Sequence, residues 1–181
     1  MAKSTEMSGL PRTAAFPYNP GMIGIMSDSH DNLDAVRKAV RLFQDSGCDL
    51  IIHAGDFVAP FSAQVLGSAG CEVKAVFGNC DGEKHGLKTM FGPFGTIRKA
   101  PFVFAHEGKR IAVIHLDAPV GELVASGEYD LVVYGHTHRP DVRRAGSTLI
   151  VNPGETGGWV TKRSTVALYD PATGEASIHP L

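Results

Sequence analysis

The chain has 181 residues, of which 43% are hydrophobic and 20% are charged, and its formal net charge is -2. This length and composition suit one globular domain with a sizeable core, and a charge so near zero excludes a general attraction to nucleic acid or to an anionic membrane. No apolar run approaches the ~20 residues needed to span a bilayer, and no signal peptide is evident, so we expect no membrane association. The three cysteines (Cys48, Cys71 and Cys80) have no C-x-x-C spacing, which favours a reducing compartment, the cytoplasm.

The N-terminal segment differs in composition from the rest of the chain. Residues 1–21 carry three prolines and show no hydrophobic periodicity, which predicts a flexible extension. The periodic pattern begins at residue 22 and contains no internal repeat. We therefore expect a single domain over residues 22–181.

The first half of this domain is predicted to alternate strands and helices. Residues 22–28 are apolar on both faces, as in a central strand of an α/β sheet. A helix follows, with Asp31 as its predicted N-cap and Gly47 at its end. The next elements are a strand, a helix and a strand, at residues 49–53, 60–68 and 72–78. This order predicts parallel strands connected by right-handed helical crossovers.

The second half is predicted to be mainly β-structure. Residues 101–105 and 110–116 flank a turn and form a predicted hairpin. A short helix near residues 119–127 precedes a strand at 129–134. Four more short strands are separated by glycine and proline turns, at residues 141–145, 147–151, 164–170 and 175–179. We expect a mixed sheet or two packed sheets with helices on the outside.

Polar side chains that can bind metals follow five of these predicted strands. They are Asp28 and His30, His53 and Asp56, Asn79 and Asp81, His115, and His136 and His138. The carboxyl ends of parallel strands meet in a crevice where ligands bind. Clustered carboxylates resist burial without a cation, and mixed oxygen and imidazole donors suit Mn, Fe, Co, Ni or Zn. The donors outnumber the needs of one ion, which indicates two divalent metals.

These residues form five motifs in chain order. They are D-x-H at Asp28–His30, G-D at Gly55–Asp56, G-N-C-D at Gly78–Asp81, the strand-end His115, and G-H-T-H at Gly135–His138. The series strongly resembles the calcineurin-like metallophosphoesterases, in particular their small single-domain phosphodiesterases from bacteria and archaea. The resemblance covers roughly residues 22–179. It implies an α/β fold, an αββα sandwich of two mixed sheets flanked by helices, which agrees with the expected strands.

The resemblance also implies a role for each motif residue. One metal would be bound by Asp28, His30 and His138, the other by Asn79, His115 and His136, and Asp56 would bridge the two. A hydroxide shared by two such ions attacks the phosphorus of a small phosphate monoester or diester in line with the leaving oxygen. The resemblance thus implies a phosphodiesterase with two divalent ions, Mn foremost. It further implies a possible homo-oligomer, a dimer or a tetramer.

Two positions depart from the usual family pattern. Cys80 stands where many members of the family have a proton-donating histidine. The small phosphodiesterases commonly have a cysteine at this position too. The cysteine leaves Asp81 and bulk water as candidate general acids. The fourth motif has Leu116 and Asp117 where the family usually has glycine and histidine. Asp117 is either an extra carboxylate that acts in the site or a solvent-facing helix N-cap ahead of Pro119.

Three further histidines lie outside the motif positions. His53 is either a partner that orients a metal ligand or a histidine of the core. His106 and His179 are expected to be exposed. The small side chains of Cys48 and Cys71 are expected to pack at the ends of elements rather than to react.

Two segments near the motifs are rich in glycine or in basic residues. Residues 83–99 predict a solvated helix and loop, with the alternative that their basic side chains lean over the site and attract phosphate. Residues 152–158 lack the Lys-Ser/Thr pair of a phosphate-binding loop, so we expect a turn that packs near the site.

Two other functions compete with a phosphodiesterase. The retromer vacuolar-sorting subunit has this fold as an interaction scaffold and largely lacks the chemistry, whereas all seven expected ligands are present here, which favours catalysis. A nucleotide-specific phosphatase or a nuclease is the other alternative. The basic pairs Arg143–Arg144 and Lys162–Arg163 are too few to indicate polynucleotide binding. We therefore expect a small phosphate ester as the substrate.

Overall fold

The computed structural model describes residues 21–181, so the prediction of an N-terminal extension lies, apart from Gly21, outside the described residues. Within this range the strands form a six-stranded and a five-stranded sheet. The first sheet has the order β11-β10-β1-β2-β3-β4 and the second has the order β5-β6-β7-β9-β8. Both sheets are mixed, since each combines parallel with antiparallel pairs.

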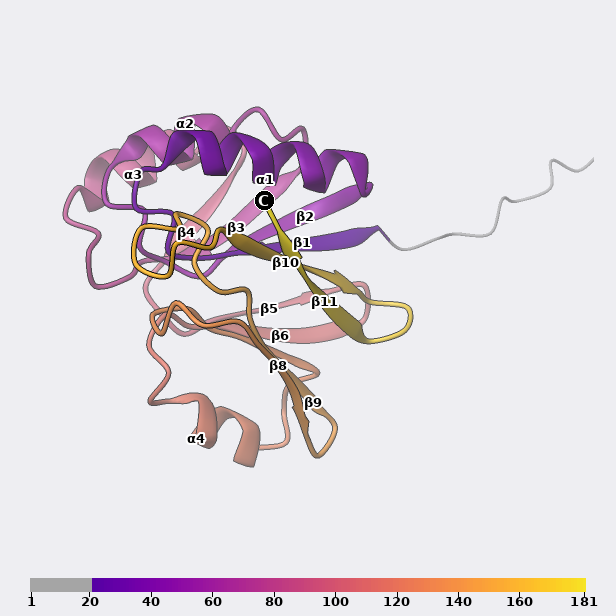
Figure 1. The fold of residues 1–181 in the computed structure, drawn as a ribbon. Helices are drawn as coiled ribbons and strands as arrows, with labels where there is room; N and C mark the ends of the chain where they lie inside the picture. The colour runs from indigo at the N-terminus through magenta and orange to yellow at the C-terminus, as the bar shows by residue number, and fades with distance from the viewer. Residues whose placement is uncertain (1–20) are drawn as a thin grey trace, which may run out of the picture.

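The first sheet carries three helices on its outer face (Figure 1). Its strands are β1 (Met22–Met26), β2 (Cys48–His53), β3 (Glu72–Val76), β4 (Gly95–Arg98), β10 (Thr165–Asp170) and β11 (Glu175–Pro180). The helices are α1 (Leu33–Asp45), α2 (Pro60–Leu66) and α3 (Lys84–Phe91). Apolar residues such as Val36, Leu66 and Phe91 pack these helices onto the sheet.

The second sheet faces the first and carries α4 on its outer side (Figure 1). Its elements are β5 (Phe102–His106), β6 (Lys109–Val113), α4 (Val120–Ala125), β7 (Leu131–Val133), β8 (Asp141–Ala145) and β9 (Thr148–Asn152). Ile25 and Ile52 of the first sheet meet Val113 and Leu131 of the second in one fully buried apolar layer. The predicted αββα sandwich is therefore confirmed. From residue 21 onward, the structure contains no helix of the length and apolar character that a bilayer crossing demands.

The N-cap predicted for the first helix was wrong. Asn32, not Asp31, caps α1, because its side-chain oxygen accepts a hydrogen bond from the amide of Ala35. The Asp31 carboxylate instead accepts hydrogen bonds from the Ser62 hydroxyl and amide, at 2.9 and 3.3 Å, and so ties the β1–α1 loop to α2.

The segment at 83–99 contains a strand that was not predicted. It forms α3 and then β4, which pairs in parallel with β3. Leu87 and Phe91 of α3 are buried against the sheet, while its Lys84, His85 and Lys88 are exposed, so the predicted helix is present and only its outer face is solvated. β4 has four residues and a single buried side chain, Ile97, which is too short for an alternating pattern to be detected.

Packing between β1 and α1 is close enough to test by substitution. Gly24 is one of the helix-facing positions of β1, and an added Cβ there would lie 2.6 Å from the ring of Phe43. We expect Gly24→Ala to lower the free energy of unfolding by about 1–3 kcal/mol, because an overpacked core must shift. Gly121→Ala in α4 is the control, since its Cβ meets nothing within 4 Å. Equal stabilities of both variants in urea unfolding would contradict this packing.

Candidate metal centre

The candidate site lies where the parallel strands of both sheets end. Asp28 and Asp56 follow β1 and β2 of the first sheet, while His115 and His136 follow β6 and β7 of the second. Backbone hydrogen bonds join these loops, from the Asp28 amide to the Gly55 carbonyl at 2.9 Å and from the Gly135 amide to the His115 carbonyl at 3.1 Å. Side chains distant in sequence are therefore held at one edge of the sandwich.

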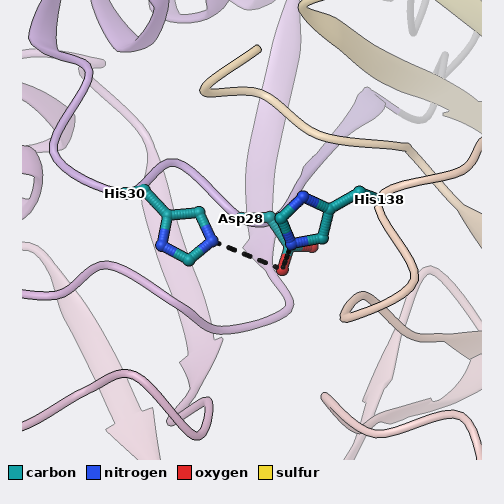
Figure 2. A group of neighbouring side chains, drawn as sticks. All are labelled: Asp28, His30 and His138. Atoms are coloured by element: carbon teal, nitrogen blue, oxygen red, sulfur yellow. Dashed lines mark ion pairs between the residues drawn. The ribbon is translucent and has the colours of Figure 1, made fainter. Parts of the chain in front are cut away.

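One group of ligand atoms consists of Asp28, His30 and His138. Figure 2 shows both imidazoles aimed at the same carboxylate. The Asp28 Oδ1 atom lies 3.3 Å from His138 Nε2 and 4.0 Å from His30 Nε2. Asp28 is fully buried, yet among residues 21–181 neither its Oδ1 nor His30 Nε2 has a hydrogen-bond partner. Burial raises the pKa of Asp28, although the neighbouring Ser27 and the nearby His115 and His138 oppose the rise.

A second group surrounds His115. Its Nδ1 lies 2.8 Å from the Ala54 carbonyl, which only accepts hydrogen bonds, so Nδ1 donates there. Its Nε2 lies 2.9 Å from Asn79 Oδ1 and 3.4 Å from Asp56 Oδ2. The lone pair of the neutral ring then points at two oxygen acceptors, an arrangement that a proton or a cation must stabilise. Burial lowers the pKa of His115, but the hydrogen bond and charge of Asp56 outweigh it, and the pKa is raised overall.

Asp56 lies between the two groups. Its Oδ2 is 3.7 Å from His30 Nε2 and 3.4 Å from His115 Nε2, while its Oδ1 accepts a hydrogen bond from the Cys80 amide at 2.8 Å. Burial raises the pKa of Asp56, yet the bonds from His115 and from the Cys80 amide bring it well below its ordinary value. This position between the two groups thus holds a stable anion.

His136 joins the same edge from β7. Its ring centroid is 5.3 Å from that of His115 at an interplanar angle of 70°, and its amide donates to Asp28 Oδ2 at 3.1 Å. The structure therefore brings all seven predicted ligands together, Asp28, His30, Asp56, Asn79, His115, His136 and His138.

The donor atoms fit divalent metal ions. Three overlapping groups have ligand atoms within 4.8 Å of one another, Asp28 with His30 and His138, Asp28 with Asp56 and His115, and His30 with Asp56 and Cys80. Two ligands that each lie about 2.0–2.2 Å from one ion are themselves roughly 3–4 Å apart, as these atoms are. Carboxylate and imidazole donors suit first-row transition metals. The Cys80 thiol is exposed, and partial burial and nearby carboxylates raise its pKa, so it favours the neutral form.

The backbone at these positions has an uncommon conformation. Positive φ angles between 41° and 66° occur at five of the seven predicted ligands, Asp28, His30, Asp56, His136 and His138. Such angles cost roughly 1–3 kcal/mol each outside glycine and are concentrated at functional sites. They turn the chain sharply after each strand. At Gly135 a Cβ would collide with Ser27 Oγ, so only glycine lets β7 approach β1 here.

Comparison with known proteins agrees with this geometry. The family model for the calcineurin-like phosphoesterase superfamily domain matches residues 22–174. The chain belongs to the calcineurin-like phosphoesterase superfamily. It is therefore a hydrolase of phosphoric esters, and the family implies divalent metal ions.

Individual relatives place the chain among the small members of this superfamily. It is 33% identical to phosphodiesterase MJ0936 of Methanocaldococcus jannaschii over 82% of this chain and 92% of the relative. It is 30% identical to phosphodiesterase YfcE of Escherichia coli over 71% of this chain and 75% of the relative. A solved archaeal phosphodiesterase superposes with a TM-score of 0.84 at 32% identity, covering 88% of this chain and 99% of its own. Vacuolar protein sorting 29 of Cryptosporidium parvum, at 13% identity and a TM-score of 0.68 over 91% and 98% of the chains, shares the fold.

One residue of the phosphoesterase site was missed in the sequence. Glu155 is fully buried in the turn after β9, and its carboxylate accepts hydrogen bonds from the amides of Val160 and Thr161, both at 2.8 Å. Its Oε1 lies 3.6 Å from His138 Nδ1. Residues 152–158 do form a turn beside the site as predicted, and the single acid in that turn was the available signal.

The other histidines have defined partners. His53 is fully buried and stacks on Phe57 at 3.6 Å, while its Nε2 is 3.0 Å from Ser29 Oγ and its Nδ1 accepts from the Gly55 amide. It is thus a core histidine that also links both carboxylate loops. His106 is not freely exposed, because its Nε2 lies 3.2 Å from Asp49 Oδ1. His179 is only partly buried and pairs with Ser177 Oγ at 2.8 Å.

The two predicted proton donors lie in different surroundings. Asp81 is buried, and its carboxylate accepts from the amides of Phe57, Val58 and Gly78 at 2.7–2.8 Å. Asp117 is exposed and belongs to none of the groups of metal-binding atoms in the described chain. Pro119 is the N-cap of α4, without a side-chain hydrogen bond, so the N-cap alternative for Asp117 was wrong.

The three amide contacts of Asp81 predict a large effect on stability. We expect Asp81→Asn to lower the free energy of unfolding by about 2–3 kcal/mol, because an amide group cannot accept all three bonds and brings a donor against them. Asp34→Asn is the control, since Asp34 is exposed and pairs only with Arg37 on the surface, which is worth about 0.5 kcal/mol or less. Urea unfolding measures both, and equal losses would contradict a framework role for Asp81.

Proposed function

We propose that the chain is a metal-dependent phosphodiesterase that uses two divalent ions to hydrolyse small phosphate monoesters and diesters. The observation that carries the proposal is the pair of buried carboxylates, Asp28 and Asp56, each facing imidazole nitrogens at 3.3–4.0 Å. The phosphodiesterases of Methanocaldococcus jannaschii and Escherichia coli, to which the chain is similar, support the reaction class.

The proposed ligand sets follow the two groups of donor atoms. Asp28, His30 and His138 would hold one ion, and Asn79, His115 and His136 the other. Asp56 would bridge both, which its position between the groups supports. The lowered pKa of Asp56 keeps its carboxyl group ionised, so that neither oxygen carries a proton.

Neighbouring residues orient these ligands. The Ala54 carbonyl fixes the proton of His115 on Nδ1 and leaves Nε2 free for an ion. Glu155, itself held by two amides, lies in position to orient His138 through Nδ1. Asn79 contributes a carbonyl oxygen without adding negative charge. These contacts preset the donor directions before substrate arrives.

Bound ions would supply a nucleophilic water of lowered pKa and would offset the negative charge that develops on the phosphate. The three amide contacts of Asp81 support a positioning role, in place of the general acid considered from the sequence, and leave water as the proton donor. Manganese is the proposed metal, with Fe, Ni, Co or Zn as alternatives that suit the same donors.

We further propose that residues 22–181 act as one domain in the cytoplasm. The three free cysteines support a reducing compartment. Exposed apolar side chains at Phe61, Trp159 and Val160 support self-association as a dimer or a tetramer, because large apolar groups on a surface commonly mark contacts.

The central test is the hydrolysis of bis-p-nitrophenyl phosphate with added manganese. We expect about two ions per chain in the wild type, and a fall in kcat/KM of more than about 100-fold in Asp56→Asn, because the shared ligand loses an anionic oxygen. Metal content and turnover are measured on the same preparation. Asp34→Asn on the surface of α1 is the matched control. Full turnover by Asp56→Asn, or by a protein freed of metal, would contradict the proposal.

The altered fourth motif gives a separate prediction. Asp117 is exposed and lies outside the groups of ligand atoms, so we expect Asp117→Asn to change kcat/KM by less than about two-fold for either a monoester or a diester. The ratio of the two rates is the decisive quantity. A clear shift of that ratio would restore Asp117 as a carboxylate that acts on substrate.

A further inference from the structure

An apolar pocket opens beside the metal centre. Its volume is about 600 Å³. The apolar part of its wall is formed by Phe77, Ile114, Leu116, Pro119, Leu123 and Tyr129. The lining residues follow β3 of the first sheet and β6 of the second, or belong to α4 and its flanking loops, so the pocket lies between α4 and the ends of strands from both sheets.

The pocket and the metal centre share two residues. Asn79 and His115 line the pocket, and the same side chains meet each other at 2.9 Å in the second ligand group. An ester whose phosphate lies against this group therefore has the pocket directly beside it. The pocket is within reach of one organic group of the ester.

Leu116 is exposed at this wall although it is large and apolar. It is 46% exposed and follows the ligand His115 directly. An apolar surface at the mouth of a site contributes about 25 cal/mol for each Å² that a ligand covers. The leucine thus gives the pocket an affinity for apolar groups.

The charged residues that line the pocket are both acidic, while the ammonium groups of Lys84 and Lys88 lie 5.9 and 6.0 Å from the centre of the Phe77 ring in the opposite wall. Glu122 lies on the exposed side of α4, and Glu128 follows the helix. Glu128 is paired with Arg110 at 3.0 Å, so Glu122 carries the main negative charge at the rim. A second phosphate or a carboxylate on the ester would meet repulsion there. A neutral organic group would not.

We propose that this pocket binds an uncharged, apolar organic group of the phosphate ester, an aromatic group above all, and that Leu116 is the specificity-determining residue. The inference rests on the proposed function, because it assigns a substrate class to the same site. It disfavours esters whose additional anionic group would point toward Glu122 on α4.

The test compares phenylphosphonate with methylphosphonate as inhibitors of the manganese-loaded enzyme. We expect phenylphosphonate to have a Ki about ten-fold lower, because its ring leaves water for the pocket. In Leu116→Ala the ratio should fall to about three or less, with the Ki of methylphosphonate unchanged. Val142→Ala is the control, since Val142 on β8 is 37% exposed and lies outside the pocket. An unchanged ratio in Leu116→Ala overturns the proposal.

A second variant tests the charge at the rim. We expect 4-carboxyphenylphosphonate to inhibit the wild type about five-fold less well than phenylphosphonate, and Glu122→Gln to remove at least half of that difference. No penalty for the added carboxylate would overturn the assignment to uncharged groups.

Direct binding separates this proposal from the catalytic one. In metal-free protein, phenol should shift the methyl NMR signals of Leu116 and Leu123 and leave those of Val142 unchanged. Turnover that depends on Asp56, without aryl preference or methyl shifts, overturns the pocket and leaves the phosphodiesterase standing. Methyl shifts without any metal-dependent turnover overturn the catalytic proposal and the substrate role together, and favour a partner protein's side chain as the occupant.

Discussion

Two buried carboxylates, Asp28 and Asp56, impose the main constraint on this structure. Burying an anion costs several kcal/mol unless charges or donors compensate for it. The chain supplies some compensation to Asp56, through the Cys80 amide and His115, but it leaves one oxygen of Asp28 without a hydrogen bond in the described residues. Three kinds of group keep this pair of carboxylates in place. They are the surrounding imidazoles, the groups that contact those imidazoles (the Ala54 carbonyl and the Glu155 carboxylate), and Gly135, which allows the close approach of the loops.

The fold meets this constraint through the ends of its parallel strands. The predicted metal-binding residues follow β1, β2 and β3 in one sheet and β6 and β7 in the other. The apolar layer between the sheets holds these two groups of strand ends at the same edge. Residues with positive φ angles directly after the strands then turn the side chains inward. The strain of these turns is offset by the core beneath them, in which residues such as Ile25 and Val113 are fully buried.

Much of this arrangement was predictable because it depends on local patterns. Continuous apolar runs marked the buried strands, and polar residues directly after them marked the edge of the site. Other features depend on contacts between distant segments. Asp31 and Asn32 are both good caps, and contacts with distant segments separate their roles, because Asp31 accepts a hydrogen bond from Ser62 and Asn32 donates one to the Gly157 carbonyl. Glu155 meets His138 only after β9 and β7 are paired, and the wall around Leu116 is formed by four separate parts of the chain.

The order of the first sheet has a consequence for synthesis on the ribosome. β1 is the earliest strand to emerge in the described chain, yet one of its two neighbours is β10, at residues 165–170. Until that strand is made, β1 keeps an open edge of unpaired backbone groups, which can pair with other chains. The complete sheet therefore forms only after β10 and β11, at residues 165–180, have been made. β2 occupies the opposite edge of β1, so protection of the open edge in the meantime falls to any chaperone that meets the nascent chain.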